Sequence, residues 1–452
     1  MTQPLRKIVI VNTADDGGGA ECVSMAVLNG FLQLGIDAWL LVGNKTRNHA
    51  RVVSFYTSAF FDYRPYLDPS LTEEIEERRR VDRSLGLEDF NHPYSHLIDQ
   101  LTGTPPDLVL CHNLHGGYFD LRALIGLSAR MPVALRLFDT WLLAGHCAYS
   151  LGCERWRIGC GECPDLTIPP AIAADGTHAN FVLKQQIFQN AQLFVSAESQ
   201  WMLDRARQSV LAPAAIDLKH ISGGVNLSIF HPGPRDAARR QLGLDPDTTL
   251  LLYVANDGAA NRYKDFATVR RALQALAGRS PAGRIVLLVV GDGAAEEVIS
   301  PNIAIRHVGR VRSRSWLAAY YRAADVMLHA AVEETFGNVV AEAMACGTPV
   351  ISASGGGVVE LIEQGRTGMV VAPRQPAQLA DAIQRLLDRP ALRAEMGEAA
   401  AAWAETHLDS RVMIRSLLSW CTESHAAWHA RAALHARTAL HARAELHARA
   451  GT

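Results

Sequence analysis

Short apolar runs alternate with amphipathic stretches along most of the chain. The amphipathic stretches predict helices, for example at Ala20–Leu34, Phe266–Leu276 and Pro376–Leu387. The apolar runs predict strands at Lys7–Val11, Trp39–Val42, Asp107–Cys111, Val133–Phe138, Leu193–Ser196, Thr249–Ala255, Ile285–Val290, Ala304–His307, Val326–His329, Thr348–Ser352 and Gly368–Val371. Continuous apolar strands separated by helices are typical of parallel sheets covered on both faces. The pattern predicts an α/β protein whose ligands lie beyond the carboxyl ends of its strands.

Glycine and proline cluster at residues 220–226 and 230–234, and the α/β pattern restarts after them. Such a cluster is typical of a boundary between domains. We therefore expect one doubly wound domain over residues 1–225 and a second over residues 226–405.

The last residues follow a different pattern. His429, His435, His441 and His447 each begin a His-Ala-Arg triplet, so the repeat is six residues long. Six residues advance a helix by about 600°, which spreads the repeat over several faces. We expect a solvated, partly helical, low-complexity tail over residues 425–452. A metal-binding histidine tract and a contact of the arginines with an anionic membrane surface are the alternatives.

Composition narrows the class of protein. The 452 residues are 48% hydrophobic and 20% charged, as in a soluble globular protein, and the net charge of −2 gives no reason to expect nucleic acid as a partner. The longest apolar runs are too short to cross a bilayer. Residues 1–11 enter a strand almost at once and do not resemble a signal peptide. We expect a cytoplasmic protein whose cysteines are reduced or metal-bound.

Two glutamates, Glu334 and Glu342, stand eight residues apart and are followed by a glycine triplet, residues 355–357, and by Glu360. Ionised carboxylates only accept hydrogen bonds and therefore suit the diols of a sugar or a ribose. Glycines let backbone N–H groups approach a phosphate. If residues 334–342 are mostly helical, the two glutamates lie roughly 12 Å apart, the span of a sugar joined to a nucleoside diphosphate.

This stretch resembles the donor site of the retaining GT-B glycosyltransferases of family 4. The family pattern is a Glu, seven residues, a second Glu, then Gly-x-Pro-Val and Gly-Gly-x-x-Glu. The resemblance implies two Rossmann-like domains that face each other across a cleft, and a helix over residues 406–424 that crosses back to the first domain. It implies that Glu334 binds the donor sugar, that Glu342 binds the ribose, and that the diphosphate lies on the backbone of Phe336, Gly337, Asn338, Val339, Gly356 and Gly357.

Other candidate residues follow single strands. Arg262 and Lys264 could clamp a diphosphate and neutralise the leaving group. The family often has an arginine nearer to Asn256, so the first of these roles passes here to Arg262. Gly18 and Gly19 would bring backbone close to the donor phosphates or the acceptor, and Gly309 would line the nucleotide. A surface basic loop and ordinary tight turns are the alternatives.

Two strands of the first half end in residues that could meet the sugars, His115 and Asp139. His115 could orient an acceptor hydroxyl or the donor sugar, although a core or capping histidine is the alternative for it and still more for His112. The family usually has His-Asp where this chain has Phe138-Asp139. The family's sugar-binding histidine is therefore absent from that position or supplied from elsewhere.

Four cysteines, Cys147, Cys153, Cys160 and Cys163, fall within an insert at residues 145–165. A Cys-x-x-Cys knuckle with two upstream cysteines can form a tetrahedral zinc site. Two disulfides or free thiols are the alternatives. The insert is similar to one in bacterial glycosyltransferases of the exopolysaccharide or colanic-acid type. The zinc would be structural and outside the catalytic chemistry.

The combined expectation is a glycosyltransferase. It would transfer a sugar from a UDP- or GDP-linked donor, with retention and without a catalytic metal, to a saccharide or lipid-linked saccharide. This chemistry would serve cell-surface polysaccharide synthesis, in the cytoplasm or at the inner membrane face. The alternatives are another GT-B enzyme, such as a nucleotide-sugar epimerase or a phosphorylase, and a non-catalytic nucleotide-sugar-binding protein.

Overall fold

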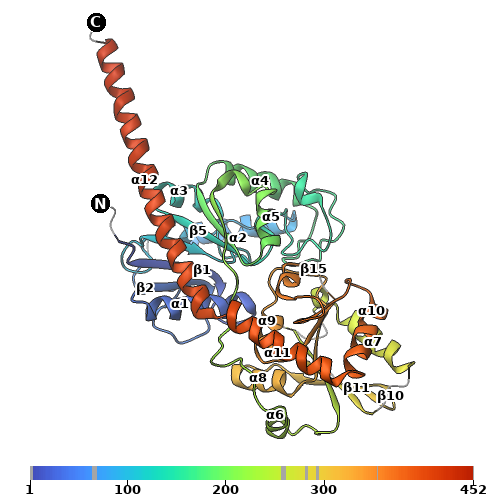
Figure 1. Cartoon of the computed structure of the whole chain (residues 1–452). Coiled ribbons are helices and arrows are strands. Elements are labelled where there is room, and N and C mark those ends of the chain that lie inside the picture. The colour runs from blue at the N-terminus through green and yellow to red at the C-terminus, as the bar shows by residue number, and fades with distance from the viewer. Residues whose placement is uncertain are drawn as a thin grey trace.

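The computed structural model describes residues 4–63, 69–255, 261–279, 283–291, 295–353 and 355–450. The side chains of Pro69, Arg262, residues 435–437 and residues 439–450 lie outside that description. The described part folds into two α/β domains, and a long C-terminal helix runs back from the second domain to the first (Figure 1). The predicted fold class, GT-B with two doubly wound sheets, is confirmed.

The first domain is built on a parallel sheet in the order β3-β2-β1-β4-β5-β6-β7. Its strands are β1 Lys7–Ala14, β2 Asp37–Asn44, β3 Val52–Ser54, β4 Leu108–Cys111, β5 Val133–Leu137, β6 Leu193–Ala197 and β7 Ala215–His220. Its helices are α1 Gly19–Gln33, α2 Pro69–Ser84, α3 Ala123–Arg130, α4 Thr177–Gln189 and α5 Gln200–Arg207.

The second domain has a sheet in the order β10-β11-β9-β8-β12-β14-β16, in which only the edge pair β10–β11 is antiparallel. Its strands are β8 Thr249–Val254, β9 Ile285–Val290, β10 Glu297–Ser300, β11 Ile303–Gly309, β12 Val326–His329, β14 Val350–Ser352 and β16 Gly368–Val370. A separate two-stranded parallel ladder joins β13 Glu333–Glu334 to β15 Gly355–Gly356. The helices are α6 Arg235–Leu242, α7 Phe266–Ala277, α8 Arg314–Ala323, α9 Asn338–Ala345, α10 Pro376–Leu387 and α11 Pro390–His407.

Alternate residues of a central strand point into different apolar cores, which explains why each sheet is covered by helices on both faces. In β1, Ile8 and Ile10 join one apolar core, whereas Val9 and Val11 join the core on the opposite face. Successive strand residues point to opposite faces, so a strand that is apolar throughout must be buried on both. Helices cover both faces of each sheet. The ends of the strands are therefore the places where polar side chains can form a site.

The C-terminal helix α12 spans Ser410–Ala450. Its first turns complete the first domain, because Ile414, Leu417 and Trp420 are buried in the same core as Ile8 and Ile10. The helix expected over residues 406–424 begins at Ser410 and does not end at residue 424: it continues through the His-Ala-Arg repeats and extends away from the body (Figure 1). Among the helices of the described part, none is both long enough and apolar enough to cross a bilayer.

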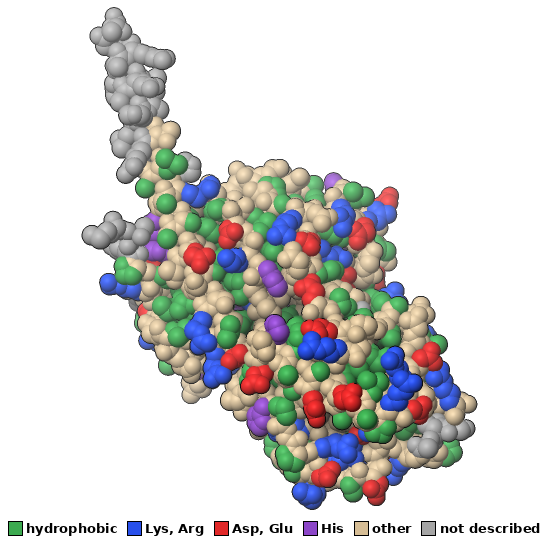
Figure 2. Space-filling view, viewed as in Figure 1, with side chains coloured by type: hydrophobic (Ala, Val, Ile, Leu, Met, Phe, Trp, Pro, Cys, Tyr) green, Lys and Arg blue, Asp and Glu red, His purple; other side chains and the backbone are tan. Residues whose placement is uncertain are grey.

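Charges on the visible face are mixed in sign. Acidic and basic side chains are interspersed over both domains in Figure 2. This distribution agrees with the net charge of −2.

Candidate active site

Two side-chain caps hold the loop that carries Lys264. The Asn261 carboxamide oxygen accepts the backbone N–H of Tyr263 at 3.1 Å, and the Asp265 carboxylate caps helix α7 by accepting the N–H of Thr268 at 3.3 Å. Between these caps, the Lys264 ammonium donates a hydrogen bond to the Glu334 carboxylate. The Arg262 side chain and Asn256 lie outside the described residues, so the role expected of Arg262 stays a prediction.

Glu334 lies in β13, where its backbone pairs with Gly356 of β15. Only glycine suits that partner, because Gly356 has φ +90° and an added Cβ would lie 2.3 Å from the Glu334 carbonyl oxygen. His329 Nε2 lies 3.7 Å from the same carboxylate oxygen that binds Lys264. Burial alone would raise the pKa of Glu334, but Lys264 and His329 outweigh it and lower the pKa to about 2. Glu334 is therefore ionised at neutral pH.

The helical geometry assumed for residues 334–342 holds only from Asn338 onward. Residues 333–334 form a strand, and helix α9 begins only at Asn338, after Gly337 has turned the chain at φ +89°. A separation calculated from helical geometry therefore does not apply to the two glutamates. The first N–H groups of α9 have no partner within the helix, and the helix dipole favours an anion beside them. The N-terminus of α9 is chemically suited to the diphosphate contacts predicted at Phe336–Val339. The binding of a diphosphate there stays a prediction.

Glu342 lies on the buried side of α9 and already has two protein partners. Tyr321 donates its hydroxyl to one carboxylate oxygen at 3.0 Å, and Arg314 donates to the other. Burial raises the pKa of Glu342, and Arg314 and Tyr321 oppose that rise. Neither partner was expected from the sequence. Their spacing of seven residues places them on one face of α8 and is the only signal that could have found them.

The glycine loop of the first domain meets the second domain. An added Cβ on Gly19 would lie 2.8 Å from the Asn338 carboxamide nitrogen, so the two domains approach each other closely at this point. Arg310, directly after Gly309, donates to the Gly17 carbonyl oxygen at 3.1 Å. The Gly18 N–H, however, already donates to the Glu21 carboxylate at 2.7 Å. A phosphate would have to displace that carboxylate, and the roles expected of Gly18, Gly19 and Gly309 stay predictions.

His115 and Asp139 form a pair in the first domain, with His115 Nε2 at 2.8 Å from Asp139 Oδ2. The other Asp139 oxygen accepts the N–H of Trp141 at 2.9 Å. Burial alone would lower the pKa of His115, but the charge and hydrogen bond of Asp139 raise it above its ordinary value. The structure therefore favours a protonated His115.

His112 and Phe138 have structural contacts. His112 is buried, bonds the Ser24 hydroxyl at 2.7 Å and meets the Phe138 ring at 4.9 Å between centroids; burial lowers its pKa to about 3. The Phe138 carbonyl oxygen accepts the Thr335 hydroxyl at 2.8 Å. Because Phe138 precedes Asp139 and Thr335 follows Glu334, this bond joins the His115–Asp139 pair to the Lys264–Glu334 pair across the domain interface.

Further contacts across the interface were not expected from the sequence. The Ser150 hydroxyl donates to Glu333 at 2.9 Å, and the Glu360 carboxylate accepts the N–H groups of Gln200 and Trp201 at the start of α5, at 2.9 and 2.7 Å. Ser150 lies 183 residues from Glu333 in sequence, so no local pattern could indicate the contact.

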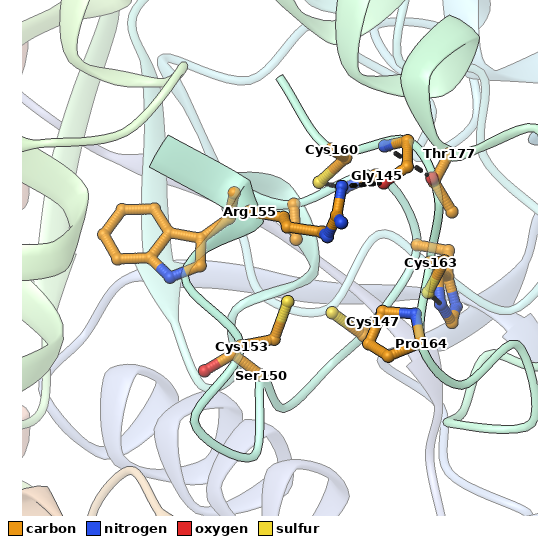
Figure 3. A pocket seen from close by; sticks show the side chains of 13 residues that line it. Gly145, Cys147, Ser150, Cys153, Arg155, Cys160, Cys163, Pro164 and Thr177 are labelled. Atoms are coloured by element: carbon orange, nitrogen blue, oxygen red, sulfur yellow. Dashed lines mark hydrogen bonds between the residues drawn. The ribbon is translucent and has the colours of Figure 1, made fainter. Parts of the chain in front are cut away.

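The four insert cysteines line one cavity of about 20 Å³, which can hold a single water-sized occupant (Figure 3). His146 and Arg155 also line it. All four are free thiols, so the disulfide alternative does not occur in this structure. The Gly145 N–H donates to the Cys160 sulfur at 3.2 Å. Within the described residues, no three His, Cys, Asp or Glu side chains already form an arrangement that would hold a metal ion.

The chain is similar to known glycosyltransferases. Residues 248–389 match the family described as glycosyl transferases group 1. The D-inositol 3-phosphate glycosyltransferase of Rhodococcus opacus is 31% identical over 307 residues, 65% of this chain and 64% of that protein. D-inositol 3-phosphate glycosyltransferase 2 of Catenulispora acidiphila is 37% identical over 198 residues, 41% of this chain and 45% of that protein. The chain thus spans between about half and two thirds of these relatives.

Solved structures extend the likeness over both domains. Sucrose-phosphate synthase from Thermosynechococcus elongatus superposes with a TM-score of 0.65 at 19% identity, covering 93% of this chain and all of that one. Anabaena Alr3699/HepE, solved in complex with UDP and glucose, superposes with a TM-score of 0.60 at 17% identity, covering 92% and 98%. At these identities the likeness shows the fold alone. The chain has the GT-B fold, and residues 248–389 of its second domain match the glycosyl transferases group 1 family.

Proposed function

We propose that this protein is a glycosyltransferase that moves a sugar from a nucleoside diphosphate donor to an acceptor hydroxyl, with retention of configuration. One observation carries the proposal. Glu334, paired with Lys264, lies four residues before the start of α9, and the bond from Thr335 to Phe138 joins this ion pair to the His115–Asp139 pair of the other domain. A cation, a carboxylate, a helix N-terminus and a histidine are thereby gathered at one domain interface.

Each group has a role in this proposal. The ionised Glu334 accepts hydrogen bonds from sugar hydroxyls, and Glu342 accepts them from the ribose. The diphosphate lies at the first turn of α9, where Lys264 exchanges part of its contact with Glu334 for the phosphate charge. His115, oriented by Asp139, supplies the histidine that the Phe138-Asp139 sequence lacks.

The chemistry needs no protein nucleophile. The bond between the anomeric carbon and the donor phosphate breaks, and the acceptor oxygen bonds that carbon on the same face. The departing phosphate takes the acceptor proton, while Lys264 and Arg262 stabilise its charge. Domain closure excludes the water that would otherwise hydrolyse the donor.

The identity of the donor and the acceptor is part of the proposal. The UDP and glucose bound to HepE, which shares the fold, support a UDP-linked donor, and GDP is the second base to test. The curated relatives are named for D-inositol 3-phosphate as the acceptor, whereas the cysteine insert led us to expect a saccharide or lipid-linked saccharide. The proposed place in cell-surface polysaccharide synthesis, at the inner membrane face, depends on which acceptor is used.

A donor and acceptor screen tests the proposal. The purified chain is incubated with UDP- and GDP-sugars, with and without saccharides or inositol phosphate, and the product anomer is determined by NMR. We expect slow donor hydrolysis that Glu334→Ala and Lys264→Ala abolish, and faster transfer with one acceptor. An epimerised donor would identify a GT-B epimerase instead, and binding without turnover would identify a non-catalytic protein.

We also propose that Cys147, Cys153, Cys160 and Cys163 bind one structural Zn²⁺. The number and the chemical type of the ligands support this proposal, because four thiols line a cavity the size of a single ion. The sulfurs do not yet form a closed coordination shell, so binding requires the insert to tighten around the ion. Elemental analysis of protein purified without chelator tests it. About one zinc per chain is expected, and absence of zinc would refute the site.

A further inference from the structure

The cysteine insert reaches the donor domain through Ser150. Its backbone N–H donates to one Glu333 oxygen at 3.0 Å, and its hydroxyl donates to the other at 2.9 Å. Arg205 of α5 donates to the Ser150 hydroxyl oxygen at 2.9 Å. Ser150 is 2% exposed and Glu333 is 6% exposed, so this contact is buried. The residue before Glu334 is thereby fixed to the insert of the other domain.

Tyr149, next to Ser150, lies against the donor domain as well. Its ring meets the ring of Tyr263 at 5.0 Å between centroids and at 51°. The Tyr263 carbonyl accepts the backbone N–H of Val332 at 3.0 Å, which joins the Lys264 loop to the segment entering β13. Tyr149 thus touches the residue before Lys264, and its chain neighbour binds the residue before Glu334.

The Tyr149 hydroxyl is not engaged by another group in the described part of the protein. Within the described ranges it makes no hydrogen bond, and the side chain is only partly buried. Glu334 and Asp139, one from each domain, are the two charges that influence it most. A phenol is protonated at neutral pH and can therefore donate a hydrogen bond.

We propose that Tyr149 is a substrate-contacting residue whose phenol O–H donates a hydrogen bond to an oxygen of the transferred sugar, between Glu334 and Asp139. The inference rests on the proposed function and extends it. The cysteine insert supplies part of the sugar subsite in addition to bracing the domain interface. A sugar oxygen accepts as well as donates, so a neutral phenol complements carboxylates that can only accept.

The alternative is that Tyr149 only packs on Tyr263. Tyr149→Phe separates the two, because it keeps the ring contact and removes only the hydroxyl. We expect kcat/KM for donor turnover to fall about tenfold or more, the loss of one hydrogen bond in the transition state. The Kd for the nucleoside diphosphate without sugar and the melting temperature should both stay at the wild-type values. Tyr56→Phe is the matched control, since that phenol bonds His92 at 3.3 Å in the first domain.

Wild-type kinetics in Tyr149→Phe would overturn the inference. So would an equal loss of affinity for the diphosphate with and without sugar, because that result would mark a bracing role. Tyr149→Ala gives a second comparison: we expect it to lower the melting temperature as well as turnover. If the wild-type protein turns over no nucleotide sugar, the proposed function is wrong and the inference falls with it. An active wild type with an unaffected Tyr149→Phe defeats the inference alone.

Discussion

Replacing Lys264 by methionine should destabilise the second domain by about 3 kcal/mol at neutral pH. Glu334 is 7% exposed, and the pKa of its carboxyl lies at about 2 instead of 4.5, chiefly because Lys264 opposes the effect of burial. Each unit of such a shift corresponds to about 1.4 kcal/mol between the protonation states. Methionine keeps most of the lysine stem volume but leaves a buried carboxylate without its main cation.

The pH dependence of this loss of stability follows from the direction in which folding shifts the pKa of Glu334. A glutamate whose pKa is lowered by folding contributes stability above about pH 4.5, and the contribution disappears as the pH falls toward 2. The difference between wild type and Lys264→Met should therefore narrow from about 3 kcal/mol at pH 7 to roughly half of that at pH 3.

Calorimetry between pH 3 and pH 7 measures the effect. For a domain of this size, 3 kcal/mol corresponds to a fall in melting temperature of roughly 6–12 °C. Lys264→Met/Glu334→Gln should recover part of the loss, because it removes the unpaired charge. Arg279→Met is the control: its partner Asp381 is 67% exposed, so little change is expected. A Lys264→Met shift no larger than that of Arg279→Met, or one that does not vary with pH, would refute the reasoning.

Three further predictions follow from the same geometry. Asp139→Asn should lower the pKa of His115, because the carboxylate is what raises it, and an NMR titration of the imidazole would show the protonated form lost at lower pH than in the wild type. Gly356→Ala should lower the melting temperature of the second domain, since its Cβ would lie 2.3 Å from the Glu334 carbonyl oxygen; an unchanged value would contradict the pairing of β13 with β15. Cys163→Ser should reduce bound zinc measured by elemental analysis, and retention of a full equivalent would exclude Cys163 as a ligand.

The central strands could be predicted from sequence, whereas β3, β7 and β10 could not. β3 and β7 are the two edges of the first sheet, and β10 is an edge of the second. β7 and β10 are only partly covered and lack the continuous apolar run that marks the centre of a parallel sheet, whereas β3 is buried but only three residues long. β7 illustrates this point: its residues are intermediate or exposed, whereas every residue of β6 is buried.

Within the candidate site, the sequence could predict residues but not their partners. Lys264 and Glu334 were both expected, yet their ion pair spans 70 residues. The motif indicated a ligand-binding role for both, and the structure shows that they also bind each other. The contacts of Ser150, Glu333 and Tyr149 depend on how the two domains dock, which no periodicity within either domain encodes.

The residues on either side of Glu334 connect the docking of the two domains to the candidate site. Glu333 binds Ser150 and Thr335 binds the Phe138 carbonyl, so Glu334 is fixed between two contacts to the other domain. Separation of the domains would break both contacts and leave the conformation of the β13 segment less constrained. We therefore expect a ligand held by Glu334 to bind the docked state more tightly than the open state, and by linkage such a ligand favours docking. Under the proposed function, donor binding and domain closure would then be one coupled equilibrium, transmitted through the residues adjacent to Glu334.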